Sequence, residues 1–358
     1  MTPLEQALIR RIRAEGPMTV AEYMSLCLTH PEHGYYTTRD PFGGKGDFIT
    51  APEVSQMFGE LIGLALAQYW MDVGRPDPFV LAELGPGRGT LMADALRATA
   101  AVPGFHRAVT LCLVEASGVL RDVQKAALSG YDVQWVDGVD RLPDGPLFLV
   151  ANEFFDAIPI RQFLRKGDGW VERLIGLDDA GELAFGLGPQ TAYGLLQDKV
   201  ESTKEGDIVE VSAGQTALMG EVGQRIAEHG GLALVIDYGD WGTGADTLQA
   251  LAGHRKVGPL DLPGQSDLTA HVDFSALAKD LPEGATHSKL MKQGEVLACW
   301  GIVQRAEALA ENLESEALQS HVAAFHRLTS ADEMGSLFRM MAVTQSGTPG
   351  APGFDYGG

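Results

Sequence analysis

The sequence predicts an α/β protein built on a doubly wound, largely parallel sheet, with a helical addition before it and an antiparallel insert within it. Short apolar runs alternate with helical segments, which is typical of parallel strands covered by helices on both faces. The runs span residues 79–84, 109–115, 133–136, 147–151 and 231–239. A glycine-rich turn, Gly85 to Gly89, follows the first run directly. Because ligands of such sheets bind where the strands end, this turn marks the expected site.

Composition limits the classes of partner and compartment. The chain has 358 residues, enough for one large α/β domain with additions or for two smaller domains. Its formal charge of −21 argues against nucleic acid as a partner. Three widely spaced cysteines exclude a disulfide framework and a cysteine-rich metal site. We expect a cytoplasmic protein with no metal site and no integral membrane segment, because neither a membrane span nor a persuasive targeting segment is evident; the oligomeric state stays open.

The segments before the first strand are expected to be mainly helical. Apolar residues at helical spacing predict an amphipathic helix over 3–15, and a capping box begins a second helix over 20–28. A long helix is predicted over 55–73. The glycine-rich segment 43–53 before it is either a lid over a bound ligand or an ordinary surface loop, and its position favours neither.

The second half of the chain departs from the parallel pattern. Alternating residues around a Gly-Asp-Gly turn indicate a β-hairpin that begins an insert at residue 161. Residues 284–303 can supply antiparallel last strands, 304–343 are predicted to be helical, and the tail after Ser346 is predicted to be loosely ordered. The expected divisions are 1–75 (helical and lid region), 76–160 (first half of the core), 161–205 (insert), 206–305 (second half of the core) and 306–358 (C-terminal helices and tail).

The spacing of the glycine turn distinguishes between cofactors. The dinucleotide fingerprint needs a third glycine where this chain has Thr90, and here a carboxylate, Glu83, stands two residues before Gly85. Glu-x-Gly-x-Gly-x-Gly after a strand resembles motif I of the class I S-adenosylmethionine (SAM) methyltransferases. SAM carries a sulfonium and an ammonium group, both of which favour nearby carboxylates. The resemblance implies a Rossmann-like class I methyltransferase fold with SAM as cofactor.

Acidic residues that close consecutive strands extend this site. Glu115 can accept both ribose hydroxyls, and Asp137 or its neighbours can contact the adenine amine. Asn152 and Glu153, at the tip of the fourth strand, are expected beside the reactive end of the cofactor. The expected cofactor-binding residues are Glu83, Gly85, Pro86, Gly87, Gly89, Thr90, Glu115, Asp137, Asn152 and Thr50.

Beyond motif I, the chain resembles the MidA family, which includes the mitochondrial complex I assembly methyltransferase. The matching segments are 16–24, 30–36, 46–53, 83–90, 151–157, 236–239 and 269–274. The resemblance covers nearly the whole chain in order and is least clear over 161–205. It implies SAM as cofactor and, by analogy with the mitochondrial member, an exposed arginine of a protein as substrate, such as a subunit of respiratory complex I. The mitochondrial address does not carry over, because no persuasive transit peptide precedes the first matching segment.

Methyl transfer from a sulfonium is an in-line displacement that depends on alignment and exclusion of water. For an arginine acceptor, carboxylates can hold the planar guanidinium and direct electron density to the attacking nitrogen. We expect Glu153 to form this clamp, with Asp156 behind it or Glu210 across the cleft, and Asn152 beside it. His271 is a proton acceptor, a substrate contact or a structural residue. Asp273 is a plausible helix N-cap at the expected substrate side.

Three other functions stay open. A methyltransferase of a small molecule would carry the same cofactor motif. A non-catalytic assembly or binding protein could keep the fold as a scaffold, although intact Gly85, Gly87, Gly89 and Glu115 argue against it. An NAD-dependent oxidoreductase is disfavoured by Thr90.

Overall fold

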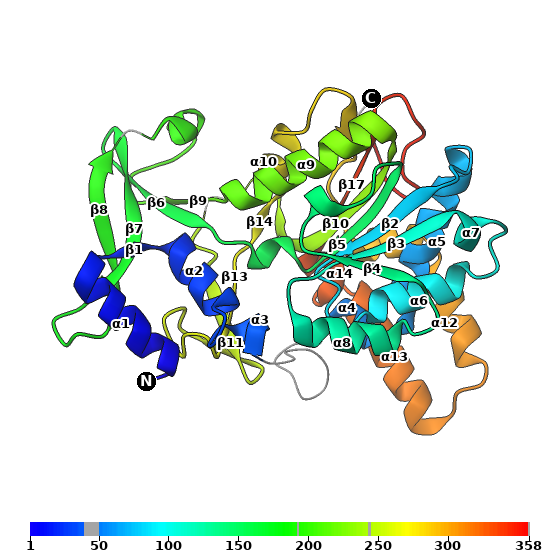
Figure 1. Cartoon of the computed structure of the whole chain (residues 1–358), viewed down its shortest axis with the longest axis horizontal. Helices are drawn as coiled ribbons and strands as arrows, with labels where there is room; N and C mark the ends of the chain where they lie inside the picture. The colour runs from blue at the N-terminus through cyan, green and yellow to red at the C-terminus, as the bar shows by residue number, and fades with distance from the viewer. Residues whose placement is uncertain (39–49, 192, 243–244, 357–358) are drawn as a thin grey trace.

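The computed structural model describes residues 1–38, 50–191, 193–242 and 245–356, so residues 43–49 of the predicted lid lie outside the described residues. A central sheet has the strand order β15-β17-β10-β5-β2-β3-β4, with five parallel strands followed by antiparallel neighbours (Figure 1). The predicted doubly wound α/β fold is confirmed. The parallel strands are β2 (Phe79–Leu84), β3 (Val109–Val114), β4 (Val133–Val136), β5 (Leu147–Asn152) and β10 (Gly231–Asp240).

Two cores cover the two faces of this sheet. Successive side chains of a strand point to opposite faces, so Phe79 and Leu81 of β2 join one core while Val80 and Ala82 join the other. This explains why the strand is apolar without interruption. The first core is covered by α5 (Gln56–Asp72), α6 (Thr90–Thr99), α11 (Gln293–Cys299), α12 (Ile302–Ala310) and α13 (Ser315–Thr329). The second is covered by α9 (Ala213–His229) and α10 (Phe274–Lys279).

The N-terminal addition and the insert share a core of their own, on the left of Figure 1. The helices α1 (Pro3–Glu15) and α2 (Val20–Thr29) both begin with the predicted kind of capping box. They pack against a second sheet of order β1-β7-β6-β9, with β8 paired to β7. Its strand β9 follows residue 205, where the insert was expected to end. The strands are β1 (Met18–Thr19), β6 (Arg161–Lys166), β7 (Gly169–Leu177), β8 (Leu183–Thr191) and β9 (Ile208–Val211).

Two expectations for the C-terminal region are wrong. Residues 338–343, predicted to be helical, belong to strand β17 (Phe338–Gln345), which lies between β10 and β15 (Ala285–His287). Its residues are buried on both faces, so the strand lacks the alternation that would mark it in the sequence. The tail after Ser346 is not loose, because Ala351 is buried and the Trp300 indole N–H donates to the Pro352 carbonyl at 2.7 Å.

Short elements complete the chain. No described helix is long and apolar enough to cross a bilayer. The remaining elements are α3 (Tyr35–Thr38), α4 (Ala51–Val54), α7 (Phe105–Ala108), α8 (Gly118–Ala127), α14 (Met334–Leu337), β11 (Gln249–Ala252), β12 (Arg255–Val257), β13 (Asp267–Thr269), β14 (Val272–Asp273), β16 (Met291–Lys292), η1 (Val139–Arg141), η2 (Phe155–Ala157) and η3 (Gly194–Lys199).

Candidate active site

The glycine turn after β2 has a backbone that favours glycine. Gly85, Gly87 and Gly89 have φ angles of 57°, 51° and 81°, in the left-handed region. At Gly85 the space is also closed, since an added Cβ would lie 2.6 Å from a ring carbon of Phe154. The turn ends at Gly89, which is the N-cap of α6. The chain therefore passes closely over the strand ends and presents a helix start beside them.

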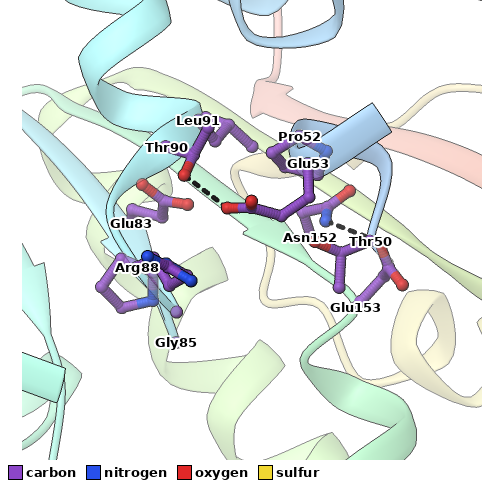
Figure 2. A pocket seen from close by; sticks show the side chains of 12 residues that line it. Thr50, Pro52, Glu53, Glu83, Gly85, Arg88, Thr90, Leu91, Asn152 and Glu153 are labelled. Atoms are coloured by element: carbon purple, nitrogen blue, oxygen red, sulfur yellow. Dashed lines mark hydrogen bonds between the residues drawn. The ribbon is translucent and has the colours of Figure 1, made fainter. Parts of the chain in front are cut away.

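A pocket of about 390 Å³ opens at this turn, and we call it the glycine-turn pocket (Figure 2). Its walls come from the end of β2, the glycine turn, the segment that enters α4, and the tip of β5. The lining residues are Thr50, Pro52, Glu53, Glu83, Gly85, Pro86, Gly87, Arg88, Thr90, Leu91, Asn152 and Glu153.

Carboxylates dominate the charge of the pocket. Glu53, Glu83 and Glu153 line it, and Arg88 is the one cation among its described lining residues. Glu53 reaches the turn from α4 and accepts a hydrogen bond from the Thr90 hydroxyl at 2.5 Å, which is drawn as a dashed line in Figure 2. The excess of negative groups favours a ligand that carries positive charge.

Glu83 is the most deeply buried of the three acids. Burial, and secondarily the charge of Glu115, raises the pKa of the Glu83 carboxyl to about 8. Its Oε2 atom is buried and accepts no hydrogen bond from the described residues. A buried polar atom without a partner is unfavourable, so a ligand that supplies a donor or a positive charge here would relieve the cost.

Asn152 and Glu153 form the tip of β5. The Asn152 Oδ1 atom is buried and unpartnered among the described residues, while its amide donates to Glu153 Oε1 at 3.1 Å. The Ala51 N–H donates to the same Glu153 oxygen at 3.0 Å, which joins α4 to the tip. Glu153 has a φ of 52°, an uncommon backbone conformation for a residue with a side chain. Burial raises the pKa of its carboxyl to about 7, against the opposing effect of these donors.

Comparisons with known proteins identify the family. The model of the family Methyltransf_28, described as S-adenosyl-L-methionine-dependent methyltransferase, matches residues 61–290. The protein arginine methyltransferase NDUFAF7 of Xenopus tropicalis mitochondria is 36% identical over 94% of this chain and 84% of its own length. The human protein of the same name is 35% identical, over 96% and 83%. This chain belongs to that family of SAM-dependent methyltransferases.

Solved structures agree with this assignment. A COG1565 superfamily member from Burkholderia thailandensis bound to S-adenosyl-homocysteine superposes with a TM-score of 0.82 at 28% identity, covering 98% of this chain and 93% of the other. A native structure of such a protein from the same organism gives 0.79 at 30% identity, with the same coverage. The resemblance to the MidA family and the prediction of SAM as cofactor are confirmed.

SAM fits the glycine-turn pocket of this methyltransferase. The unpartnered Glu83 Oε2 and Asn152 Oδ1 atoms are acceptors suited to its ammonium and hydroxyl donors, and the carboxylates suit its two positive groups. The glycine turn lets the backbone approach closely. Of the predicted cofactor-binding residues, the structure brings together Thr50, Glu83, Gly85, Pro86, Gly87, Thr90 and Asn152.

Three predicted cofactor-binding residues lie outside the pocket lining. Gly89 caps α6. Glu115 closes β3, and its carboxyl accepts the Ser117 N–H at 2.7 Å and the Gln124 amide at 3.1 Å. The Asp137 side chain is 85% exposed and pairs with Arg121 at 2.5 Å. Contacts of Glu115 with ribose and of Asp137 with adenine stay predictions.

The predicted substrate residues do not converge on Glu153. Glu210 accepts the Gln162 amide at 2.7 Å and the Thr247 N–H at 3.0 Å, and it lines neither described pocket. The structure thus places the alternative partner for the clamp in a network between the insert sheet and the segment that enters β11. Asp273 is the N-cap of α10, as its position predicted, with its carboxylate accepting the N–H groups of the first turn.

Asp156 and His271, two further predicted residues, lie in different settings. Asp156 is buried beneath the tip of β5, where burial and then the charge of Asp237 raise the pKa of its carboxyl. His271 lines a second hollow of about 700 Å³ beyond the end of β10, and burial lowers the pKa of its imidazole. At neutral pH His271 is therefore uncharged.

The prediction from sequence missed four lining residues: Pro52, Glu53, Arg88 and Leu91. Arg88 and Leu91 lie within or beside motif I. Glu53 stands 37 residues before its partner Thr90, so no local spacing connects them. The one available signal was the matching segment 46–53, which ends on this carboxylate.

Proposed function

We propose that this SAM-dependent methyltransferase transfers methyl groups to an arginine side chain of a protein. The observation that carries the proposal is Glu153, a carboxyl held at the edge of the glycine-turn pocket on a left-handed backbone. The relatives named protein arginine methyltransferase support the choice of acceptor. The resemblance to the MidA family extends it to a subunit of respiratory complex I. Cytoplasmic location stays a prediction.

The residues at the pocket have two roles, binding of SAM and orientation of the acceptor. Glu83, Asn152 and the glycine turn would hold SAM, which supplies an electrophilic methyl group on its sulfonium. The Ala51 N–H and the Asn152 amide both donate to Glu153 Oε1, and within the described residues Oε2 accepts no hydrogen bond. Glu153 can therefore accept guanidinium N–H groups, fix the plane of the acceptor and take up its proton.

The net charge suits such an acceptor. A charge of −21 over 358 residues gives a negative field that attracts a basic segment and raises the rate of encounter. Because this attraction acts between exposed charges, the apparent KM for a protein substrate should rise with salt concentration.

Glu153→Gln tests the proposal. With radiolabelled SAM and a cell lysate, the wild-type protein should label a protein band that yields methylarginine after acid hydrolysis. The variant should lose at least a hundredfold in labelling rate, because it cannot take up the proton, while its SAM affinity by calorimetry stays within a few-fold. Glu172→Gln is the control, since it alters a buried carboxylate paired with Arg161 in the insert, away from the pocket. Label in a small molecule, or undiminished labelling by Glu153→Gln, would contradict the proposal.

A further inference from the structure

A buried carboxylate, Asp237, lies beneath the tip of β5. It belongs to β10, which pairs with β5 in parallel so that Ile236 stands opposite Asn152. Its side chain has no exposed surface. Asp237 Oδ2 accepts the backbone N–H groups of three consecutive residues, at 3.1 Å from Phe154, 2.8 Å from Phe155 and 3.2 Å from Asp156.

These bonds explain the backbone of Glu153. A residue in the left-handed region that is followed by a turn points successive N–H groups to one side, which makes a small anion-binding concavity. Asp237 fills this concavity from within the chain, and its Oδ1 accepts the Tyr238 N–H at 2.9 Å. The Glu153 N–H donates to the Ile236 carbonyl at 2.9 Å, so the residue before the turn is tied to the same strand. Without the carboxylate, three N–H groups would lose their shared acceptor.

We propose that Asp237 is a positioning residue for methyl transfer, whose carboxylate holds the turn over 154–156 and thereby presents Glu153 to the glycine-turn pocket. The inference rests on the proposed function for what Glu153 binds, but not for how Glu153 is held. Asp237 itself lines neither described pocket. It acts on the acceptor only through the Glu153 backbone and through its charge.

The charge of Asp237 also affects the protonation of Glu153. Burial, and then the charge of Glu153, raises the pKa of Asp237 to about 7. The two carboxylates repel each other, so the charge of one opposes ionisation of the other. The other groups that face this pair electrostatically are Asp156, with Asp267 and Tyr36 beside it, Tyr238 and Arg327, whose positive charge opposes the rise.

Asp237→Asn removes the charge and keeps the shape. Its amide oxygen can still accept from the turn, but its NH₂ group meets the Tyr238 N–H, donor against donor. We expect the Glu153 carboxyl, followed by ¹³C NMR and assigned with Glu153→Gln, to titrate about one pH unit lower. Amide exchange at Phe154 and Phe155 should accelerate tenfold or more. In methylation assays, kcat should fall by about a hundredfold, and the acidic limb of kcat/KM should move to lower pH.

The control is Asp178→Asn, which alters another carboxylate that accepts two backbone N–H groups, those of Ala180 and Glu182, in the β7–β8 turn. It should leave the Glu153 titration unchanged. If Asp237→Asn does not fold, the reciprocal measurement decides: in Glu153→Gln, the pKa of Asp237 should fall by a similar amount. Unchanged amide exchange at Phe154 and Phe155 in Asp237→Asn would overturn the inference, as would an unchanged Asp237 titration if only Glu153→Gln folds. Full activity of Glu153→Gln together with a shifted Asp237 titration would refute the proposed function and leave the positioning of residue 153 standing.

Discussion

Gly85→Ala should lower the free energy of unfolding for two reasons: the left-handed backbone at this turn and the contact of an added Cβ with the Phe154 ring. At a φ of 57° a residue with a Cβ loses about 1–2 kcal/mol relative to glycine. The added Cβ would also meet the Phe154 ring at 2.6 Å, so the ring must retreat by about 0.8 Å to reach ordinary contact. A ring turned roughly 30° from its rotamer costs about 0.5–1.5 kcal/mol. The expected loss in the free energy of unfolding is therefore about 2–3 kcal/mol.

Two matched glycines isolate these terms. Gly253 has a φ of 56°, and nothing lies within 4 Å of a Cβ added there, so Gly253→Ala carries the backbone cost alone. Gly118 has an ordinary backbone and open space, so Gly118→Ala should be neutral or slightly stabilising. Urea denaturation should rank the losses in free energy of unfolding as Gly85→Ala, then Gly253→Ala, then Gly118→Ala. Calorimetry should show SAM affinity falling at least tenfold in Gly85→Ala alone, because only Gly85 lines the pocket.

A double-mutant cycle tests the role of the ring. In a Phe154→Ala background, the added methyl group meets no ring, so Gly85→Ala should cost about 1 kcal/mol less than in the wild type. A coupling energy near zero would show that the overlap with Phe154 does not cause the loss. A SAM affinity unchanged in Gly85→Ala would refute the placement of the cofactor at this turn.

Three further predictions concern buried carboxyls. Binding a cationic ligand requires Glu83 in its charged form, and its pKa is about 8, so SAM affinity should rise by up to tenfold per pH unit between about pH 6 and 8. Glu83→Gln should remove this dependence; the ligand's own amine titrates in both proteins and cancels when the two slopes of affinity against pH are subtracted. Equal slopes in the wild type and the variant would contradict the prediction. Glu60→Gln leaves Arg97 and Arg305 without their buried partner and should lower the free energy of unfolding by about 2 kcal/mol in urea denaturation. Asp122→Asn, which breaks an exposed pair with Lys125, should change it almost not at all. Equal losses would show that the burial of Glu60 does not strengthen its ion pairs. Glu83 and Glu153 bind protons more tightly in the folded than in the unfolded protein, so the free energy of unfolding of the SAM-free protein should fall as pH rises from about 5 to 8. The fall should reach up to about 1.4 kcal/mol per pH unit for each group and be shallower in Glu83→Gln. A wild-type free energy that rises across this window would count against the raised pKa values.

Sequence reasoning recovers the core because its signals are local. The five parallel strands are apolar runs with boundaries within a residue or two of those observed; helices or turns separate the first four, and the insert and α9 separate β5 from β10. Strand β17 escapes the same reasoning, because burial on both faces gives it no alternation and the preceding helices extend the helical pattern up to it. The pairing of β1 with β7 joins residues about 155 positions apart, and two residues of strand carry no periodicity.

In the site, too, sequence reasoning recovers what local signals specify and misses what depends on long-range packing. Glu83, Asn152 and Glu153 could be grouped in advance because the carboxyl ends of parallel strands meet at one edge, and β2 pairs directly with β5. Glu210, offered as an alternative partner across the cleft, lines neither described pocket, because its strand β9 belongs to the insert sheet, whose packing no motif specified. Asp237 lies one residue past the register partner of Asn152. No pattern in the sequence around it predicts that its carboxylate accepts hydrogen bonds from the backbone of the turn after β5.

The carboxyls that line the glycine-turn pocket favour ligand binding over the stability of the ligand-free protein. Glu83 and Glu153 are each held away from water with raised pKa values, which is unfavourable for the charged forms and reduces the stability of the protein alone at neutral pH. The two expected ligands, SAM and a guanidinium group, are both cationic. Positive charge beside these groups would lower their pKa values and recover the electrostatic free energy lost in burying them. Stability and binding are therefore opposed at this site, and neutral variants such as Glu83→Gln should gain stability in the same step as they lose affinity.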